Sequence, residues 1–182
     1  MRPVPARSRS LPQEVQLSKY EDLCAAYAAA RKSFAAGRSA ALKQAEQVVA
    51  GLVGYLGCDK RHIRFARFNT REEEKPNYTL DEVLRIVSGN TYSFGLGLTL
   101  FETAGAPPAE TLLIGISIEP VAGGYILYAK GLTEKYRLLL TADNSHVLSN
   151  FYETLFRRIR ENYKTPYLRF PAGEHTEREL GG

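Results

Sequence analysis

Four segments between residues 91 and 141 alternate apolar and polar side chains with a period of two, and this pattern limits the possible folds more than any other feature of the chain. Each such segment presents one apolar face, because successive side chains of a β-strand point to opposite sides. Short connections rich in turn-forming residues join the segments, as an antiparallel meander requires. The connection around Ala106-Pro107-Pro108 is expected to lie outside the strands. The expected apolar face consists of Tyr92, Phe94, Leu96, Leu98, Leu100, Leu112, Ile114, Ile116, Ile118, Tyr125, Leu127, Ala129, Tyr136, Leu138 and Leu140.

A pair of helices is predicted before the meander. Ser18 and Glu21 have the spacing of a capping box, and apolar residues at three- and four-residue steps continue to about residue 36. Gly37 is expected to end this helix, and a second helix from about residue 39 to Gly57 completes an αα-hairpin. Gly51 and Gly54 are expected to allow close packing. The apolar positions of the first helix are Tyr20, Leu23, Cys24, Tyr27 and Phe34.

Two shorter elements are expected between the hairpin and the meander. Residues 62–68 are typical of a strand, and Arg64 and Arg67 favour a place at the edge of the sheet. Thr79 and Glu82 form a second capping box, which predicts a short amphipathic helix closed by Gly89.

A long helix is predicted after the meander, from Asn144 or Ser145 to Tyr163, because Pro166 prevents its continuation. With 182 residues, 44% of them hydrophobic, the chain has enough apolar material for one core. We therefore expect a basic extended arm at 1–13, a single α+β domain at 14–166 and a tail at 167–182 that docks at residues 167–170 and then frays.

The second face of the predicted sheet carries unusually small residues, which indicates that something approaches it closely. Three interpretations remain open: a helix packed over the glycines, a shallow ligand cleft, or a groove for a protein or peptide. In the cleft, a tight turn at residues 131–134 would place Tyr128 opposite Arg137, with Glu119 one strand away. The candidate residues of this face are Gly95, Gly97, Thr99, Gly115, Ser117, Glu119, Tyr128 and Arg137.

Chemical motifs give little support for catalysis. No nucleophile, phosphate-loop or zinc-protease pattern occurs, and His146 near Asp143 is the acid/base pair considered. Cys58 and His62 lack a second pair of ligands, so we expect no metal site and no cofactor. Cys24 and Cys58 are expected to be reduced and at least partly buried, which is consistent with a cytoplasmic protein.

The formal net charge of +4 permits an acidic partner but falls short of a dedicated nucleic-acid binder. No apolar run is long enough for a membrane span, and no apolar secretory signal is expected. We therefore predict a non-catalytic protein-interaction or assembly subunit whose partner is another protein chain or a further copy of itself. The alternatives are a small-ligand binder or enzyme at the Glu119, Tyr128 and Arg137 face, and an RNA- or DNA-associated protein. The predicted basic patch consists of Arg2, Arg7, Arg9, Arg157, Arg158, Arg160 and Lys164.

Overall fold

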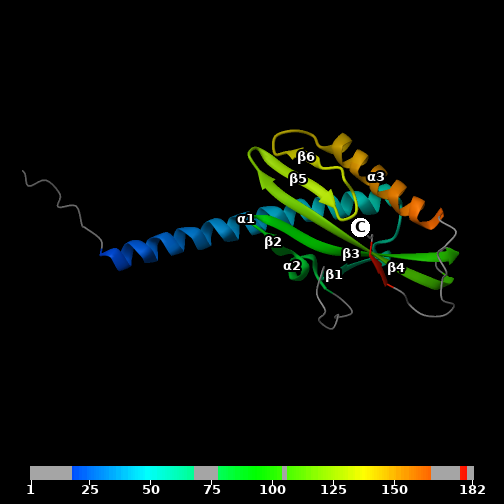
Figure 1. Cartoon of the computed structure of the whole chain (residues 1–182), viewed down its shortest axis with the longest axis horizontal. Coiled ribbons are helices and arrows are strands. Elements are labelled where there is room, and N and C mark those ends of the chain that lie inside the picture. Colours follow the sequence, from blue (N-terminus) through cyan, green and yellow to red (C-terminus); the bar gives the residue numbers. More distant parts are fainter. Residues whose placement is uncertain (1–17, 68–77, 104–105, 165–176, 180–182) are drawn as a thin grey trace, which may run out of the picture. The chain divides into compact units, whose positions relative to one another are not determined.

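The computed structural model describes residues 18–67, 78–103, 106–164 and 177–179 (Figure 1). The fold is α+β, with a long N-terminal helix, an antiparallel sheet and a C-terminal helix. The chain divides into two compact units, residues 1–38 and 39–182, and each is described by itself. The elements are α1 (Lys19–Leu56), the short 3-10 helix η1 (Lys60–His62), β1 (Ile63–Ala66), α2 (Leu80–Val83), β2 (Arg85–Ser88), β3 (Thr91–Thr103), β4 (Ala106–Val121), β5 (Gly124–Ala129), β6 (Tyr136–Leu139), α3 (Ser145–Lys164) and β7 (Glu177–Glu179).

The predicted αα-hairpin is wrong, because residues 19–56 form one helix that does not turn at Gly37. A single glycine inside a helix costs about 1 kcal/mol relative to alanine. The residues on both sides of Gly37 are mostly alanine and other strong helix formers, which offset that cost. The true end is at Gly57, whose φ of 62° lies in the left-handed region, as the sequence predicts.

The capping box that begins α1 is confirmed in the N-terminal unit. The backbone N–H of Ser18 donates to Oε2 of Glu21 at 2.7 Å, and the backbone N–H of Glu21 donates to Oγ of Ser18 at 3.3 Å. These bonds favour the charged carboxylate and hold the pKa of Glu21 below its usual value.

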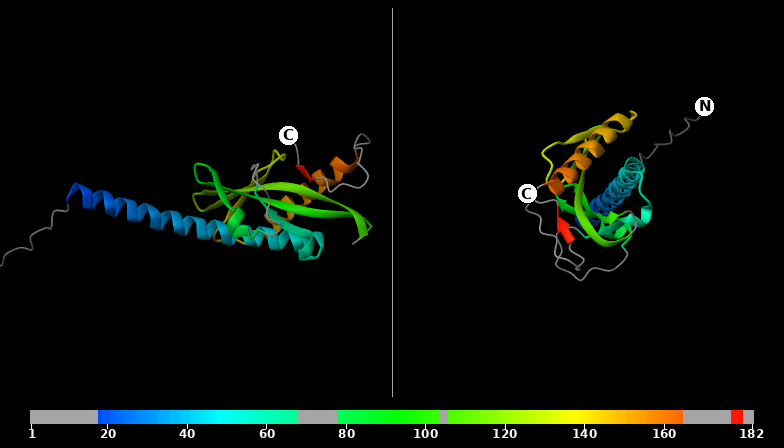
Figure 2. Two further views of the ribbon diagram at one scale, coloured as in Figure 1. Left: turned by 90° about the horizontal axis from the view of Figure 1, so that it is seen from below. Right: turned by 90° about the vertical axis from the view of Figure 1, so that its right-hand side faces the viewer.

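The predicted meander is confirmed in the C-terminal unit. The main path of the sheet runs β1-β3-β4-β5-β6, so the predicted edge position of β1 is correct. Figure 2 shows the strands of this sheet, with β3 and β4 in green, from two further directions. The register between β3 and β4 extends from Tyr92 opposite Ile118 to Phe101 opposite Ala109. This long ribbon is the central feature of the sheet, and β5 and β6 extend it on the β4 side.

Two helical segments pack on the apolar face of the sheet and form one core with it. Residues 39–56 of α1 contribute small and medium side chains, and α3 contributes two aromatic rings. Leu140 is the exception to the predicted apolar face, because it follows the last residue of β6 and is 67% exposed. The helical core residues are Ala41, Ala45, Val48, Leu52, Phe151, Tyr152, Leu155 and Ile159.

A close contact between α1 and α3 explains one of the two helical glycines. The hydroxyl of Tyr152 donates to the backbone oxygen of Val48 at 3.0 Å. A Cβ atom at Gly51 would collide with this tyrosine, so the close packing expected at Gly51 is confirmed. Gly54 is different, because a Cβ there would have no neighbour within 4 Å.

The helix predicted up to Gly89 is wrong beyond its first turn. The capping box of Thr79 and Glu82 is present, but α2 ends at Val83. Residues 85–88 instead form β2 and pair with β3 through a turn in which Gly89 has a φ of 54°. Ile86 and Val87 are β-branched and favour strand, so Gly89 is a hairpin turn residue here rather than a helix cap.

Two further differences concern the ends of β4 and of the chain. Pro107 and Pro108 lie within β4, contrary to expectation. The register shifts between Phe101 and Thr103, so the prolines occupy an irregular end of the ribbon where a missing backbone donor is tolerated. Residues 177–179, expected to fray, form β7 and pair in parallel with residues 111–113 of β4.

The start of α3 agrees with the sequence prediction and also protects the outer edge of β6. The side chain of Asn144 accepts a hydrogen bond from the backbone N–H of Leu139 at 2.9 Å and donates to its backbone oxygen at 2.8 Å. One side-chain amide therefore satisfies both backbone groups of a residue in the last strand of the path.

Candidate functional site

The small residues of the second sheet face lie together, as the period-two pattern predicts. Gly95 of β3 is opposite Gly115 of β4, and Ser93 is opposite Ser117. The Oγ atoms of Ser93 and Ser117 are 2.7 Å apart and form a hydrogen bond. Thr99 is half-buried and lies opposite Thr111 farther along the ribbon.

The neighbouring strand β1 explains why two of these positions are glycine. A Cβ at Gly95 would lie 2.6 Å from the backbone oxygen of Ala66. A Cβ at Gly97 would lie 2.7 Å from Cγ and 2.9 Å from Nε of Arg64. The groups that exclude a side chain at these two glycines therefore come from a strand, and a helix packed over this face stays a prediction.

The predicted convergence of Glu119, Tyr128 and Arg137 is not formed. Arg137 lies opposite Ile126, and Ile126 lies opposite Glu119, whereas Tyr128 lies opposite Ser117. The connection from β5 turns one residue earlier than assumed. The backbone N–H of Leu132 donates a hydrogen bond to the backbone oxygen of Ala129, and Gly131 has a φ of 81°.

The polar groups near the predicted cleft have other contacts. Nη2 of Arg137 donates to the backbone oxygen of Ala122 at 3.1 Å. Nζ of Lys135, rather than Arg137, lies 5.1 Å from the centre of the Tyr128 ring. The shared face is correct, but the cluster that would bind a small ligand is not assembled on it.

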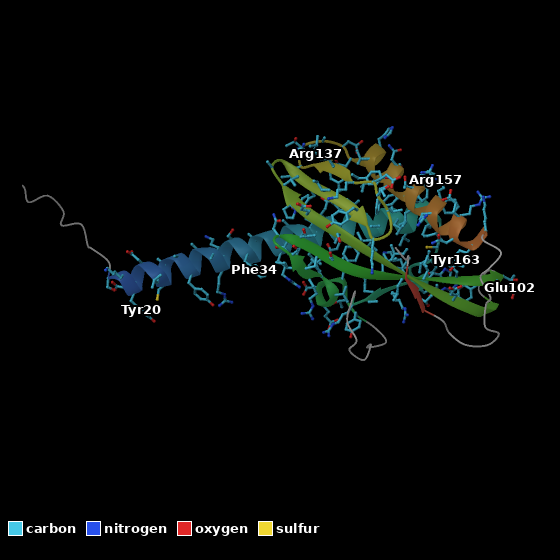
Figure 3. The ribbon with its side chains drawn as sticks, viewed as in Figure 1. Tyr20, Phe34, Glu102, Arg137, Arg157 and Tyr163 are labelled. Atoms are coloured by element: carbon cyan, nitrogen blue, oxygen red, sulfur yellow. The ribbon has the colours of Figure 1, made fainter. Side chains whose placement is uncertain are left out.

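The basic end of α3 is partly exposed. Arg157, labelled in Figure 3, is exposed, Arg160 and Lys164 are also exposed, and Arg158 is half-buried. Glu153, at the ion-pair spacing from Arg157, accepts a hydrogen bond from the hydroxyl of Tyr55, which raises the pKa of that tyrosine. The other members of the predicted patch, Arg2, Arg7 and Arg9, lie outside the described residues, so nucleic-acid binding stays a prediction.

The acid/base pair considered from the sequence is also not formed. Asp143 accepts hydrogen bonds from the hydroxyl and the backbone N–H of Ser145, and these bonds lower the pKa of Asp143. Nδ1 of His146 is instead 3.1 Å from Nδ2 of Asn150.

The cysteines offer no cross-link or metal cluster in the described part of the chain. Cys24 and Cys58 are free thiols; Cys58 is half-buried, but Cys24 is exposed, contrary to expectation. Within residues 18–67, 78–103, 106–164 and 177–179, no three histidine, cysteine, aspartate or glutamate side chains gather where they could hold a metal ion.

The N-terminal half of α1 carries an exposed apolar surface that the expected hairpin would have covered. Four large apolar side chains, expected to be buried in a hairpin, are exposed: Tyr20 by 75%, Leu23 by 69%, Tyr27 by 65% and Phe34 by 55%. Figure 3 shows Tyr20 and Phe34 projecting from the helix. We call these four residues the apolar stripe, because steps of three, four and seven residues place them on one helical face.

A signal for this surface was present in the sequence. Apart from the stripe, residues 25–30 are alanine, which supports a helix without adding much apolar surface of its own. Such a helix has large side chains on one face only. In the expected hairpin, a turn at Gly37 would have packed the second helix against that face. Because α1 continues through Gly37, residues 39–56 belong to the same helix and do not form a second one that could cover it.

Comparison with protein-family models finds no matching family, and comparisons with curated proteins and with solved structures find no match either. Among the described helices, none combines the length and the apolar character needed to cross a lipid bilayer.

Proposed function

We propose that this chain is a non-catalytic assembly subunit that binds a protein partner through the apolar stripe of α1. The observation that carries the proposal is the exposure of Tyr20, Leu23, Tyr27 and Phe34, each more than half accessible on one helical face. A single exposed apolar residue is common on protein surfaces, but a contiguous apolar patch marks an interaction site.

The stripe contains enough apolar surface for specific binding. Fully burying one large apolar side chain contributes about 1.5–3 kcal/mol. Because these four side chains are already partly covered, the stripe offers on the order of 5 kcal/mol before the costs of association. Tyrosine is also enriched at interfaces, because its ring is apolar and its hydroxyl remains hydrogen-bonded.

The other predicted surfaces have weaker support. The small-ligand alternative depended on Tyr128 lying opposite Arg137, and the observed register separates them. Gly95 and Gly97 of the sheet face are explained by β1. The third interpretation of the sheet face, a groove for a protein or peptide, stays a prediction.

Site-specific photo-crosslinking in the full chain tests the proposal. A photoreactive phenylalanine analogue replaces Tyr27, and the matched control places it at Ala29, which is about 200° away around the helix. We expect a crosslinked protein adduct from position 27 inside the native cell and at least ten times less from position 29.

The adduct must also depend on the rest of the stripe. Adding Tyr20→Ser and Phe34→Ser should remove most of it, while Ala25→Ser and Ala36→Ser on the opposite face should leave it unchanged. Equal adducts at positions 27 and 29, or none at 27, would overturn the proposed function.

A further inference from the structure

We infer that the partner of the apolar stripe is a second copy of this chain, paired antiparallel along residues 19–38 of α1. This inference rests on the proposed function and adds the identity and orientation of the partner. Three observations support it: the order of large and small residues along the stripe, the distribution of charge, and the area available.

Seven-residue spacing organises the helix face. Tyr20, Tyr27 and Phe34 are seven residues apart, and Leu23, Ala30 and Gly37 form a second such series. In a helix these two series lie side by side and form the seam of a coiled coil. Side chains of one series pack against the other series in an antiparallel pair and against themselves in a parallel pair.

The antiparallel arrangement matches side-chain volumes across the seam. It places Tyr20 opposite Gly37 of the second copy, Leu23 opposite Phe34, and Tyr27 opposite Ala30. Every layer then combines a large residue with a smaller one, which allows even packing along the helix. The parallel arrangement would place tyrosine against tyrosine and glycine against glycine, so its layers would alternate between crowding and voids.

Charge favours the same orientation. In residues 19–38 the first turn holds Lys19 and the two acids, Glu21 and Asp22, and is net negative, whereas Arg31, Lys32 and Arg38 lie in the second half. Antiparallel pairing places Glu21 of one copy on the same flank as Arg31 and Arg38 of the other, and it opposes the two helix dipoles. The capping bond uses Oε2 of Glu21, and a carboxylate accepts further bonds through its second oxygen.

The area is sufficient for a specific dimer. An aromatic side chain presents about 200 Å², so the exposed fractions of the three rings correspond to about 400 Å² on each copy. Leu23 and the neighbouring alanines raise the total for two copies to about 1,000 Å², the lower end of specific interfaces.

The oligomeric state of the full chain is the first test. Sedimentation equilibrium should give a reversible dimer at micromolar concentration. Tyr27→Lys should raise the dissociation constant by at least about 100-fold, because one substitution alters two symmetry-related layers. The matched variant Ala29→Lys, with the same added charge on the opposite face, should change it by less than about threefold.

Distances between spin labels test the orientation. With Cys24→Ser and Cys58→Ser, single cysteines are introduced at Ala29 or Ala36 and labelled. In the antiparallel pair the two copies of position 29 lie near the two-fold axis, whereas the two copies of position 36 are about 22 Å apart along the helix. The measured distance should therefore increase strongly from position 29 to position 36, while a parallel pair would give equal distances.

Each outcome decides the inference. A monomer at high micromolar concentration, a dimer unaffected by Tyr27→Lys, or equal label distances would overturn it. A monomer that still forms the position-27 adduct with a different protein would overturn this inference and leave the proposed function standing. A monomer without that adduct would remove both.

Discussion

The two halves of α1 differ in how side-chain size relates to burial. In residues 39–56 the buried positions are two alanines, one valine and one leucine, all at most 1% exposed. In residues 19–38 the apolar positions include two tyrosines and a phenylalanine, and all are more than half exposed. Small residues let a helix backbone lie close to a sheet, whereas the large rings of residues 19–38 stay exposed on the helix surface. Hydrophobicity alone therefore does not identify the core of this chain.

The same substitution in the two halves should have very different effects on folding. Leu52→Ala leaves a cavity in the core and should lower the free energy of unfolding by about 2–5 kcal/mol. Leu23→Ala, measured at concentrations where the chain is monomeric, should lower it by less than about 0.5 kcal/mol. Urea denaturation followed by circular dichroism measures both variants, and similar losses would contradict the comparison.

Two glycines in residues 39–56, Gly51 and Gly54, test how closely this half of α1 is packed. Gly51→Ala brings a Cβ against Tyr152 and should destabilise the protein by about 1–2 kcal/mol, even after the gain in helix propensity. Gly54→Ala has space and should stabilise it by about 0.5–1 kcal/mol. Thermal unfolding of both variants checks the opposite signs.

Tyr152→Phe should cost about 1 kcal/mol, because it removes the hydrogen bond to Val48. Burial raises the pKa of Tyr152 to about 12, from an ordinary value of 10.0. The unfolded chain therefore loses this proton first as the pH rises above 10, so the contribution to stability is complete below pH 10 and is lost by about pH 12. Unfolding measured across that range should show a shallower decline in the phenylalanine variant than in the wild type.

The smallest effect is expected at the start of the exposed half. Ser18→Ala removes the capping bond to the backbone of Glu21 and should weaken the first turn of α1 by about 1 kcal/mol. Amide hydrogen exchange should become faster at residues 20–22, while the unfolding midpoint of the sheet stays the same. An equal shift in both measurements would mean that the first turn unfolds together with the sheet.

Local patterns predicted those parts of the fold that depend on neighbouring residues. Alternation along β3 and β4 predicted these strands and the face that Gly95 and Gly115 share, whereas the pairing of Gly95 with Gly115 comes from the structure alone. The capping boxes at Ser18 and Thr79 specify helix starts through side chains three residues apart. In both cases the chemistry is contained in one short segment.

Glycine was the main source of error, because its effect depends on tertiary context. Gly37 is helical, Gly89 forms a hairpin turn and Gly57 ends a helix, although the sequence predicts that each of the three ends a helix. The candidate ligand cluster failed for a related reason. A turn that closes one residue earlier shifts the register by two, and this shift moves Tyr128 away from Arg137 without changing either residue's face.

The hydrogen bonds of Asn144 have a consequence for how this protein can form larger assemblies. An uncovered outermost strand offers a row of backbone groups to which a strand from another molecule can be added. At Leu139 these groups are already occupied by a side chain of the same molecule. Growth by continuing the sheet beyond β6 is therefore blocked at this residue, which closes one route that leads toward fibrils.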